Sequence, residues 1–224
     1  MDALAQLGPV MPQLLRGFLA TLELAAVALV LGTAGGVVLG CLYAWGGKLL
    51  RALLFALLTL VRGIPLVVQV FAVFFVLPVY GIKFSAMASA AIALTGFAAL
   101  TTMEVVRGGI AAVPREQFQA ARSLGFPFTT ALTTVVLPQA LRIMTPALVN
   151  QAVFLVKATS VVSLFGVTEF MFTAKEQIER TLLGFEIMAI VWIVYTVVCY
   201  PMTLLGRRIE SRLKARGHAA LAGP

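Results

Sequence analysis

The chain has 224 residues, of which 61% are hydrophobic and only 12% are charged, and its mean hydropathy is +1.01. Soluble domains carry about a quarter charged residues, so this composition excludes them and predicts an all-α integral membrane protein. The net charge of +8 does not indicate nucleic-acid binding, because most basic residues lie at the edges of apolar runs and in the tail. We expect a single transmembrane domain over residues 1–224.

Five apolar runs are long enough to cross roughly 30 Å of hydrocarbon. They cover residues 18–42, 53–77, 87–106, 147–165 and 187–205. We place the N-terminus outside and the C-terminus, with a basic tail at about 206–224, in the cytoplasm. Cytoplasmic loops carry an excess of lysine and arginine, and this orientation leaves few of them outside. The external ones are Arg16, Lys83, Lys175 and Arg180.

In the first run, Gly32, Gly36 and Gly40 recur every four residues and predict a stripe for close helix contact. The second run is interrupted at Gly63 and Pro65, where we predict a helix break, because proline has no N–H and disfavours helix at the preceding residue. A broken helix inside a membrane is tolerated only where its backbone is buried in protein or lines a wet cavity. The break therefore points to a transport path.

The loop between the third and fourth runs, at about residues 107–142, predicts a short helix over 116–124. Gly125 can take the left-handed conformation that ends a helix, and Pro127 prevents its continuation. Small side chains on this helix would let a partner approach its backbone closely, although a plain connecting loop is the alternative interpretation. We assign the partner contact to Glu116, Ala120, Ala121, Leu124 and Gly125.

No catalytic pattern is visible: His218 is the single histidine, and there is no phosphate-binding loop or set of metal ligands. The chain is predicted not to be an enzyme and to bind no cofactor of its own. A charged group within a membrane costs a few kcal/mol unless it is paired or faces water. Together with uncharged polar groups near the breaks, such residues give the candidate substrate path: Gln69, Glu104, Lys157, Thr159 and Ser160.

Alternatives stay open for these residues. Glu104 either lines the path or forms an ion pair near the loop, and Lys157 either meets a substrate carboxylate or pairs with Glu104 or Glu169. The hydroxyls of Thr159 and Ser160 either bind solute or bond carbonyls of their own helix. Arg62 is interpreted as an interface residue whose long side chain reaches the membrane surface. An aromatic stripe in the second run consists of Phe71, Phe74 and Phe75. Its rings either gate a pore or serve only in packing.

Several segments together resemble the permeases of ATP-binding-cassette (ABC) importers, in particular the polar-amino-acid subfamily. In the loop, the matching residues are Glu116, Ala120, Ala121, Gly125, Leu137, Pro138 and Arg142. The other matching segments are 62–69, 104–110 and 157–160. The resemblance implies a type I importer fold in a bacterial cytoplasmic membrane, with five transmembrane helices and a cytoplasmic coupling helix between spans three and four.

The resemblance also implies a function: a permease subunit that forms the path for polar amino acids or related small zwitterions. Its expected partners are a cytoplasmic ATPase dimer that binds the ATP, a second permease subunit (identical or homologous), an extracytoplasmic solute-binding protein and membrane lipid. The alternative is an ion-gradient-driven secondary transporter or channel for small polar solutes. Ala158 stands where the subfamily usually has an aspartate, which makes basic amino acids less favoured substrates, and Met103 replaces a usual small residue.

Overall fold

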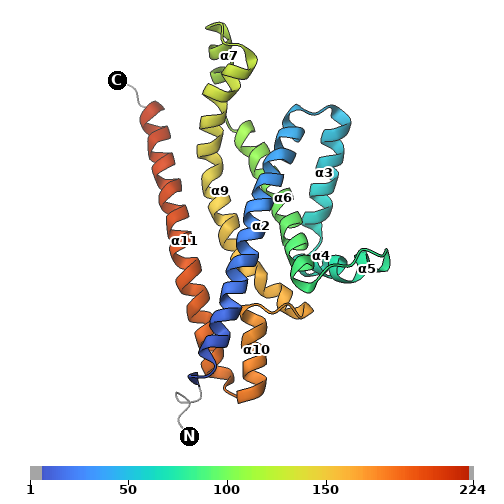
Figure 1. Ribbon diagram of the computed structural model, residues 1–224. Coiled ribbons are helices and arrows are strands. Elements are labelled where there is room, and N and C mark those ends of the chain that lie inside the picture. Colours follow the sequence, from blue (N-terminus) through green and yellow to red (C-terminus); the bar gives the residue numbers. More distant parts are fainter. Residues whose placement is uncertain (1–6, 222–224) are drawn as a thin grey trace.

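The computed structural model of the chain describes residues 7–221, with backbone only at 212 and 214–221. Within this range the protein is helical and has no β-strand, and its long helices run side by side (Figure 1). Four of the described helices are long and apolar enough to cross a membrane, and a bent pair makes up to five if its two halves form one span. The described chain starts and finishes at opposite ends of the bundle (Figure 1).

The long helices extend beyond the predicted apolar runs. They are α2 (Met11–Trp45), α6 (Ala86–Ala111), α9 (Leu137–Ala158) and α11 (Gly184–Leu221). Before α9 come α8 (Phe128–Ala131) and the π-helical η2 (Leu132–Val136), and after it comes the 3-10 helix η3 (Thr159–Phe165). This fourth span thus begins well before residue 147. The predicted apolar run misses the first turns of this span because only one face is buried there. The buried residues on this face are Ala131, Val136, Ala140 and Met144.

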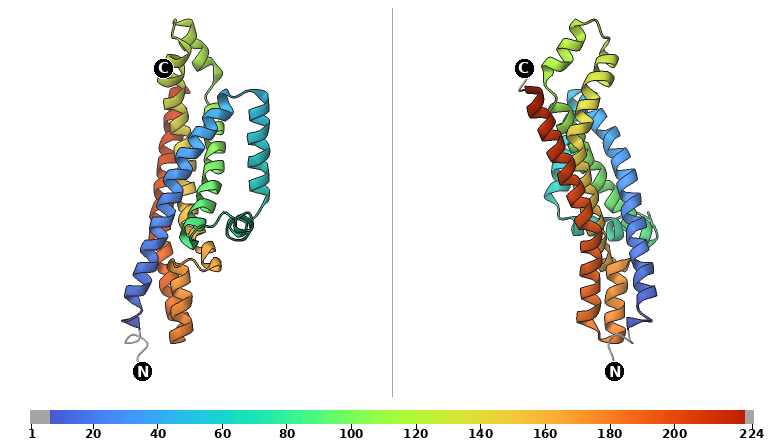
Figure 2. Two further views of the ribbon diagram at one scale, coloured as in Figure 1. Left: turned by 45° about the vertical axis from the view of Figure 1, so that its right-hand side comes forward. Right: turned by 90° about the vertical axis from the view of Figure 1, so that its left-hand side faces the viewer.

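The second apolar run forms two helices rather than one straight crossing. The first is α3 (Lys48–Gly63), and the second part comprises α4 (Leu66–Phe71), the π-helical η1 (Ala72–Val76) and α5 (Leu77–Val79). The two parts meet at 107°, and the break lies where Gly63 and Pro65 predict it. In the left view of Figure 2, the second part is seen end-on while α3 stands upright. This segment, the crosswise segment (residues 66–79), therefore lies across the bundle.

The glycine stripe of α2 packs against α6, as predicted. Gly32, Gly36 and Gly40 are buried. A Cβ atom added at Gly36 would lie 2.5 Å from the carbonyl oxygen of Ala99, and one added at Gly40 would lie 2.5 Å from Cγ1 of Val106. These two helices touch almost backbone to backbone, which only small residues allow.

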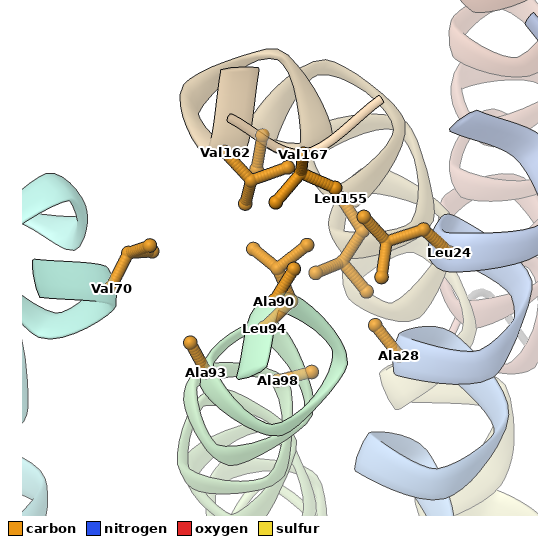
Figure 3. Close-up of a cluster of buried hydrophobic side chains, with 11 residues drawn as sticks. Leu24, Ala28, Val70, Ala90, Ala93, Leu94, Ala98, Leu155, Val162 and Val167 are labelled. Carbon is orange, nitrogen blue, oxygen red and sulfur yellow. The ribbon is translucent and has the colours of Figure 1, made fainter. Parts of the chain in front are cut away.

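The largest apolar cluster among the described residues joins five elements (Figure 3). Its side chains come from α2, α4, α6, α9 and η3, with Val167 just beyond, and include Leu24, Val70, Leu94, Leu155 and Val162. Leu24 and Ala28 lie near the middle of α2, where this helix meets the first half of α6 and the end of α9. Val70 brings the crosswise segment into this core, where its side chain is 0% exposed.

Two short helices mark the ends of the bundle. At one end α7 (Arg115–Ser123) caps the connection between α6 and α8, and at the other end α10 (Phe170–Thr181) packs beside the start of α2 (Figures 1 and 2). The predicted loop helix therefore stands apart from the apolar middle of the molecule.

Candidate functional site

Gln69 faces the helix break. Its Nε2 donates to the carbonyl oxygens of Val61 at 2.7 Å and of Ile64 at 2.8 Å. Both amide hydrogens are thus used on backbone groups at the end of α3. Among the candidate path residues, Gln69 is the one tied to the bend itself.

Glu104 is held in an ion-pair network between α3 and α6. Its Oε2 lies 2.5 Å from Nη1 of Arg62, and its Oε1 lies 3.9 Å from Nη2 of Arg107. The Arg107 guanidinium in turn lies over the ring of Tyr43, 5.7 Å from its centroid. The ion-pair alternative for Glu104 is the one observed. Arg62, interpreted from the sequence as an interface residue, is more than half exposed and also has a carboxylate partner, because the packing of α3 on α6 brings Glu104 to it across 42 residues of sequence.

Lys157 lies at the outer surface of this chain and not in an ion pair. Within residues 7–221 no acidic side chain with described atoms lies within ion-pair distance of it, so the proposed pairing with Glu104 or Glu169 is not observed. It lines a hollow of about 430 Å³ between α9 and α11. Other residues around this hollow, which we call the α9–α11 groove, include Ser160, Trp192, Thr196, Tyr200 and Thr203.

The α9–α11 groove lies beside the middle of the apolar stretch of α11 and the end of α9. Its α11 residues fall around the centre of the apolar stretch Gly184–Ser211. Ala158, next to Lys157, belongs to the central cluster with Leu24 and Ala28. The exposed Lys157, in the last turn of α9, therefore lies beside the central part of the apolar stretch of α11.

The other candidates near Lys157 are turned inward or bonded locally. Thr159 is 0% exposed and its Oγ1 donates to the carbonyl oxygen of Val156 at 2.9 Å. Ser160 donates to the carbonyl oxygen of Lys157 at 2.7 Å, although it also lines the groove. The local-bonding alternative therefore holds for both hydroxyls. Ala158 is packed in the core, so an aspartate there would be a buried acid.

The aromatic stripe on the crosswise segment packs against η3. The ring of Phe74 stacks on that of Phe165 with centroids 5.1 Å apart, and the ring of Phe75 lies 6.1 Å from the same ring. Phe71 and Phe75 remain about half exposed. Packing thus accounts for Phe74, and a gating role for the stripe stays a prediction.

Glu169 joins α10 to α2 through a buried hydrogen-bond cluster. Its Oε1 accepts the backbone N–H of Phe172 at 2.8 Å, which caps the start of α10, and its Oε2 accepts the hydroxyl of Thr21 at 2.9 Å. The same Thr21 oxygen accepts the N–H of Phe170 at 3.1 Å. Sequence reasoning missed this contact because 148 residues separate the two side chains. A lone acid beside an apolar segment was the only signal.

Burial raises the pKa of the Glu169 carboxyl, and its hydrogen bonds offset only part of this effect. The folded protein holds this proton more tightly than the unfolded chain does. The protonated carboxyl therefore stabilises the fold fully below the unfolded-state pKa, and this stabilisation is lost as pH rises through the raised pKa. We expect the melting temperature to fall with rising pH across this window. Glu169→Gln, which keeps an acceptor for the cap but carries no charge, should flatten the decline. Differential scanning fluorimetry in detergent measures the melting temperature at each pH. An identical slope of melting temperature against pH in the variant would contradict the role of the Glu169 proton.

The predicted loop helix is present as α7 and ends as expected. Gly125 has φ +85°, and its N–H donates to the carbonyl oxygen of Arg122 at 3.0 Å. The N–H of Phe126 donates to the carbonyl oxygen of Ala121 at 3.2 Å. These two bonds form the glycine-terminated motif that closes a helix and turns the chain sharply.

The two faces of α7 have different surroundings. Phe118 packs against an apolar cluster of α6 and α9, and its ring meets that of Phe128 edge to face at 5.5 Å. Ala121 is 4% exposed and lies on this inner face, so it does not offer the open surface expected of it. Glu116, Ala120 and Leu124 are exposed, and Leu124 is 78% exposed. Spaced four residues apart, they share the outward face of the helix.

A family model described as the binding-protein-dependent transport system inner membrane component matches residues 36–215. The chain belongs to this family. The match includes the break, the ion-pair network, α7 and Lys157, so the permease domain contains every candidate site residue described above.

Relatives of this permease cover nearly its whole length. A probable glutamine ABC transporter permease protein of Bacillus subtilis is 34% identical over 199 residues, which are 88% of this chain and 91% of the relative. An arginine transport system permease protein of the same organism is 29% identical over 92% of this chain and 95% of its own length. The glutamine transport system permease protein of Escherichia coli is 29% identical over 92% and 95%.

Solved permease structures show the same fold. The crystal structure of an amino acid ABC transporter with histidines matches with a TM-score of 0.87 and 27% identity, over 95% of this chain and 99% of that one. An inward-facing methionine ABC transporter matches with a TM-score of 0.71 at 21% identity, over 92% and 98%, and supports the fold alone. This permease is therefore an all-helical membrane subunit of an ABC importer.

Proposed function

We propose that this permease forms the path for polar amino acids or related small zwitterions across a bacterial cytoplasmic membrane, driven by ATP hydrolysis in a separate subunit. The amino-acid class is shared by relatives named for glutamine and arginine transport. Uncharged or acidic solutes are favoured over basic ones, since Ala158 is an apolar core residue where the subfamily usually has an acid. The chain itself needs no cofactor in this scheme.

The observation that carries the path is the exposed Lys157 beside the apolar stretch of α11. A lysine facing lipid at this depth costs a few kcal/mol, so this surface is expected to face water or a second permease subunit. The α9–α11 groove also gathers the hydroxyl groups of Ser160, Thr196 and Tyr200 along the same side. An ammonium with neighbouring hydroxyls is complementary to the carboxylate and polar group of an amino acid.

The outward face of α7 is the proposed contact with the ATPase. Glu116, Ala120 and Leu124 form it, while Ala121 and Gly125 act indirectly by seating the helix and ending it. With the N-terminus outside the cell, α7 and the C-terminus are cytoplasmic. The end of the bundle that carries α10 then faces an extracytoplasmic solute-binding protein. A second permease subunit, identical or homologous, completes the path.

Uptake of tritium-labelled glutamine into proteoliposomes tests this function. The vesicles contain the permease with its cognate ATPase and solute-binding protein, and internal ATP is present or absent. Uptake is expected only with ATP. Lys157→Met is expected to lower it about tenfold or more, because the variant removes the single charge facing the groove. Lys83→Met, in the loop after the crosswise segment, is the matched control.

Two results would contradict the proposal. Uptake that needs no ATP and follows an imposed proton or sodium gradient would make the protein a secondary transporter. Unchanged ATP-driven uptake by Lys157→Met would place the path on another face.

A further inference from the structure

Pro65 leaves a gap in the hydrogen bonding of α3. In a continuous helix the carbonyl of Val61 accepts the N–H four residues later, and that residue is Pro65, which has none. Ile64 is extended, with φ −100° and ψ 127°, so its carbonyl also leaves the helical ladder. The N–H of Val68, which would bond the Ile64 carbonyl in a continuous helix, donates to the carbonyl oxygen of Pro65 instead. The carbonyls of Val61 and Ile64 are thus among those that the break deprives of their usual donors.

The side chain of Gln69 supplies both missing donors. Its Nε2 lies 2.7 Å from the oxygen of Val61 and 2.8 Å from that of Ile64. Reversing the amide would point its oxygen at two other acceptors, so only this orientation fits. One amide group therefore substitutes for the absent N–H of Pro65 and spans the bend at the same time.

The bend that this amide bridges places the crosswise segment. Val70, the next residue, is fully buried in the central cluster, and the segment leaves α3 at 107° (Figures 2 and 3). On the other side of the break, Arg62 ties the end of α3 to Glu104 of α6. The hydrogen bonds of Gln69 are partly buried, so leaving the two carbonyls without a donor is costly there.

We propose that Gln69 is a positioning residue for transport: it fixes the angle of the crosswise segment by replacing the N–H that Pro65 lacks, and it does not contact solute. Only the expected loss of uptake rests on the proposed transport function. The hydrogen bonds of Gln69 at the break do not depend on that function. It reassigns Gln69 from the candidate substrate path to the frame that holds the path.

The first test separates positioning from substrate contact. Spin labels at exposed Leu53 on α3 and Val79 at the end of α5 report the bend by pulsed electron resonance, in full-length protein with Cys41 and Cys199 replaced. Gln69→Leu is expected to lengthen or broaden this distance and to lower maximal uptake about tenfold, with the KM for solute unchanged within about twofold. Gln69→Glu, nearly isosteric but without donors when ionised, should act alike. The control is Gln139→Leu. In the unsubstituted protein the Gln139 amide donates to one carbonyl oxygen, that of Val135, at 3.0 Å.

The second test uses the link between Gln69 and Pro65. Pro65→Ala restores a backbone N–H and lets α3 continue straight. Added to Gln69→Leu, it should recover the lost melting temperature but not the uptake, because the crosswise segment is then misplaced. A raised KM with an unchanged label distance, or equal loss of melting temperature in both backgrounds, would overturn the proposal. If the protein is not an ATP-driven importer, unsubstituted protein lacks uptake while the distance and melting results still decide the role of Gln69.

Discussion

Gly125→Val is expected to abolish ATP-driven uptake while leaving the helical bundle folded. The residue has φ +85°, where an L-residue costs about 1–2 kcal/mol and a β-branched one is most strained. No heavy atom lies within 4 Å of a Cβ added there, so the effect is one of backbone and not of crowding. Valine would therefore open the turn that ends α7 and move its outward face.

Gly125→Asn is the matched control, because asparagine is close to valine in size but tolerates the left-handed conformation. Most of the uptake should remain in this variant. Copurification of the ATPase with the permease, measured beside uptake, shows whether docking is lost. Equal activity of the two variants, or loss in both, would show that the conformation of Gly125 is not what couples α7 to its partner.

Gly36→Val is expected to give the largest loss of stability. Even the first carbon of the new side chain would meet Cβ of Thr102 and come within 2.5 Å of the Ala99 carbonyl oxygen, and the backbone of α6 cannot move aside alone. Overpacking costs about 1–3 kcal/mol, and valine at a backbone contact belongs at the upper end, equivalent to about 5–10 °C in melting temperature.

The adjacent residue gives the control for this variant. A Cβ at Gly35 would lie 3.5 Å from that of Ala99, an ordinary contact, so Gly35→Ala should melt within about 2 °C of the unsubstituted protein. Fluorescence melting in detergent compares the two. Normal stability of Gly36→Val would mean that α2 and α6 do not pack through this stripe.

Features governed by neighbouring residues were predictable from the sequence. The break at Gly63 and Pro65 follows from a missing N–H, and the end of α7 at Gly125 follows from backbone conformation. The glycine stripe of α2 also needs only a helical repeat to be recognised. In each case the physical cause acts within a few residues, so no knowledge of the fold is required.

The partners of the polar residues depended on the tertiary structure. Gln69 and Lys157 are both candidate solute contacts in the sequence, but in the structure Gln69 bonds the backbone at the break and Lys157 faces an open groove. Arg62 finds Glu104 only because α3 packs on α6. The helical repeat of α7 does not show which of its faces packs on the bundle, and only the structure shows that Ala121 is turned inward.

The sequence by itself therefore determined the membrane class, the approximate places of the apolar helices, the break and the loop helix, since burial in lipid and local backbone chemistry act on single segments. The tertiary structure alone decided the 107° bend, the pairing of Glu169 with Thr21, and the face on which Lys157 is exposed. These features depend on contacts between segments that are distant in the chain. Such contacts are chosen by the packing of whole helices, which no single segment specifies.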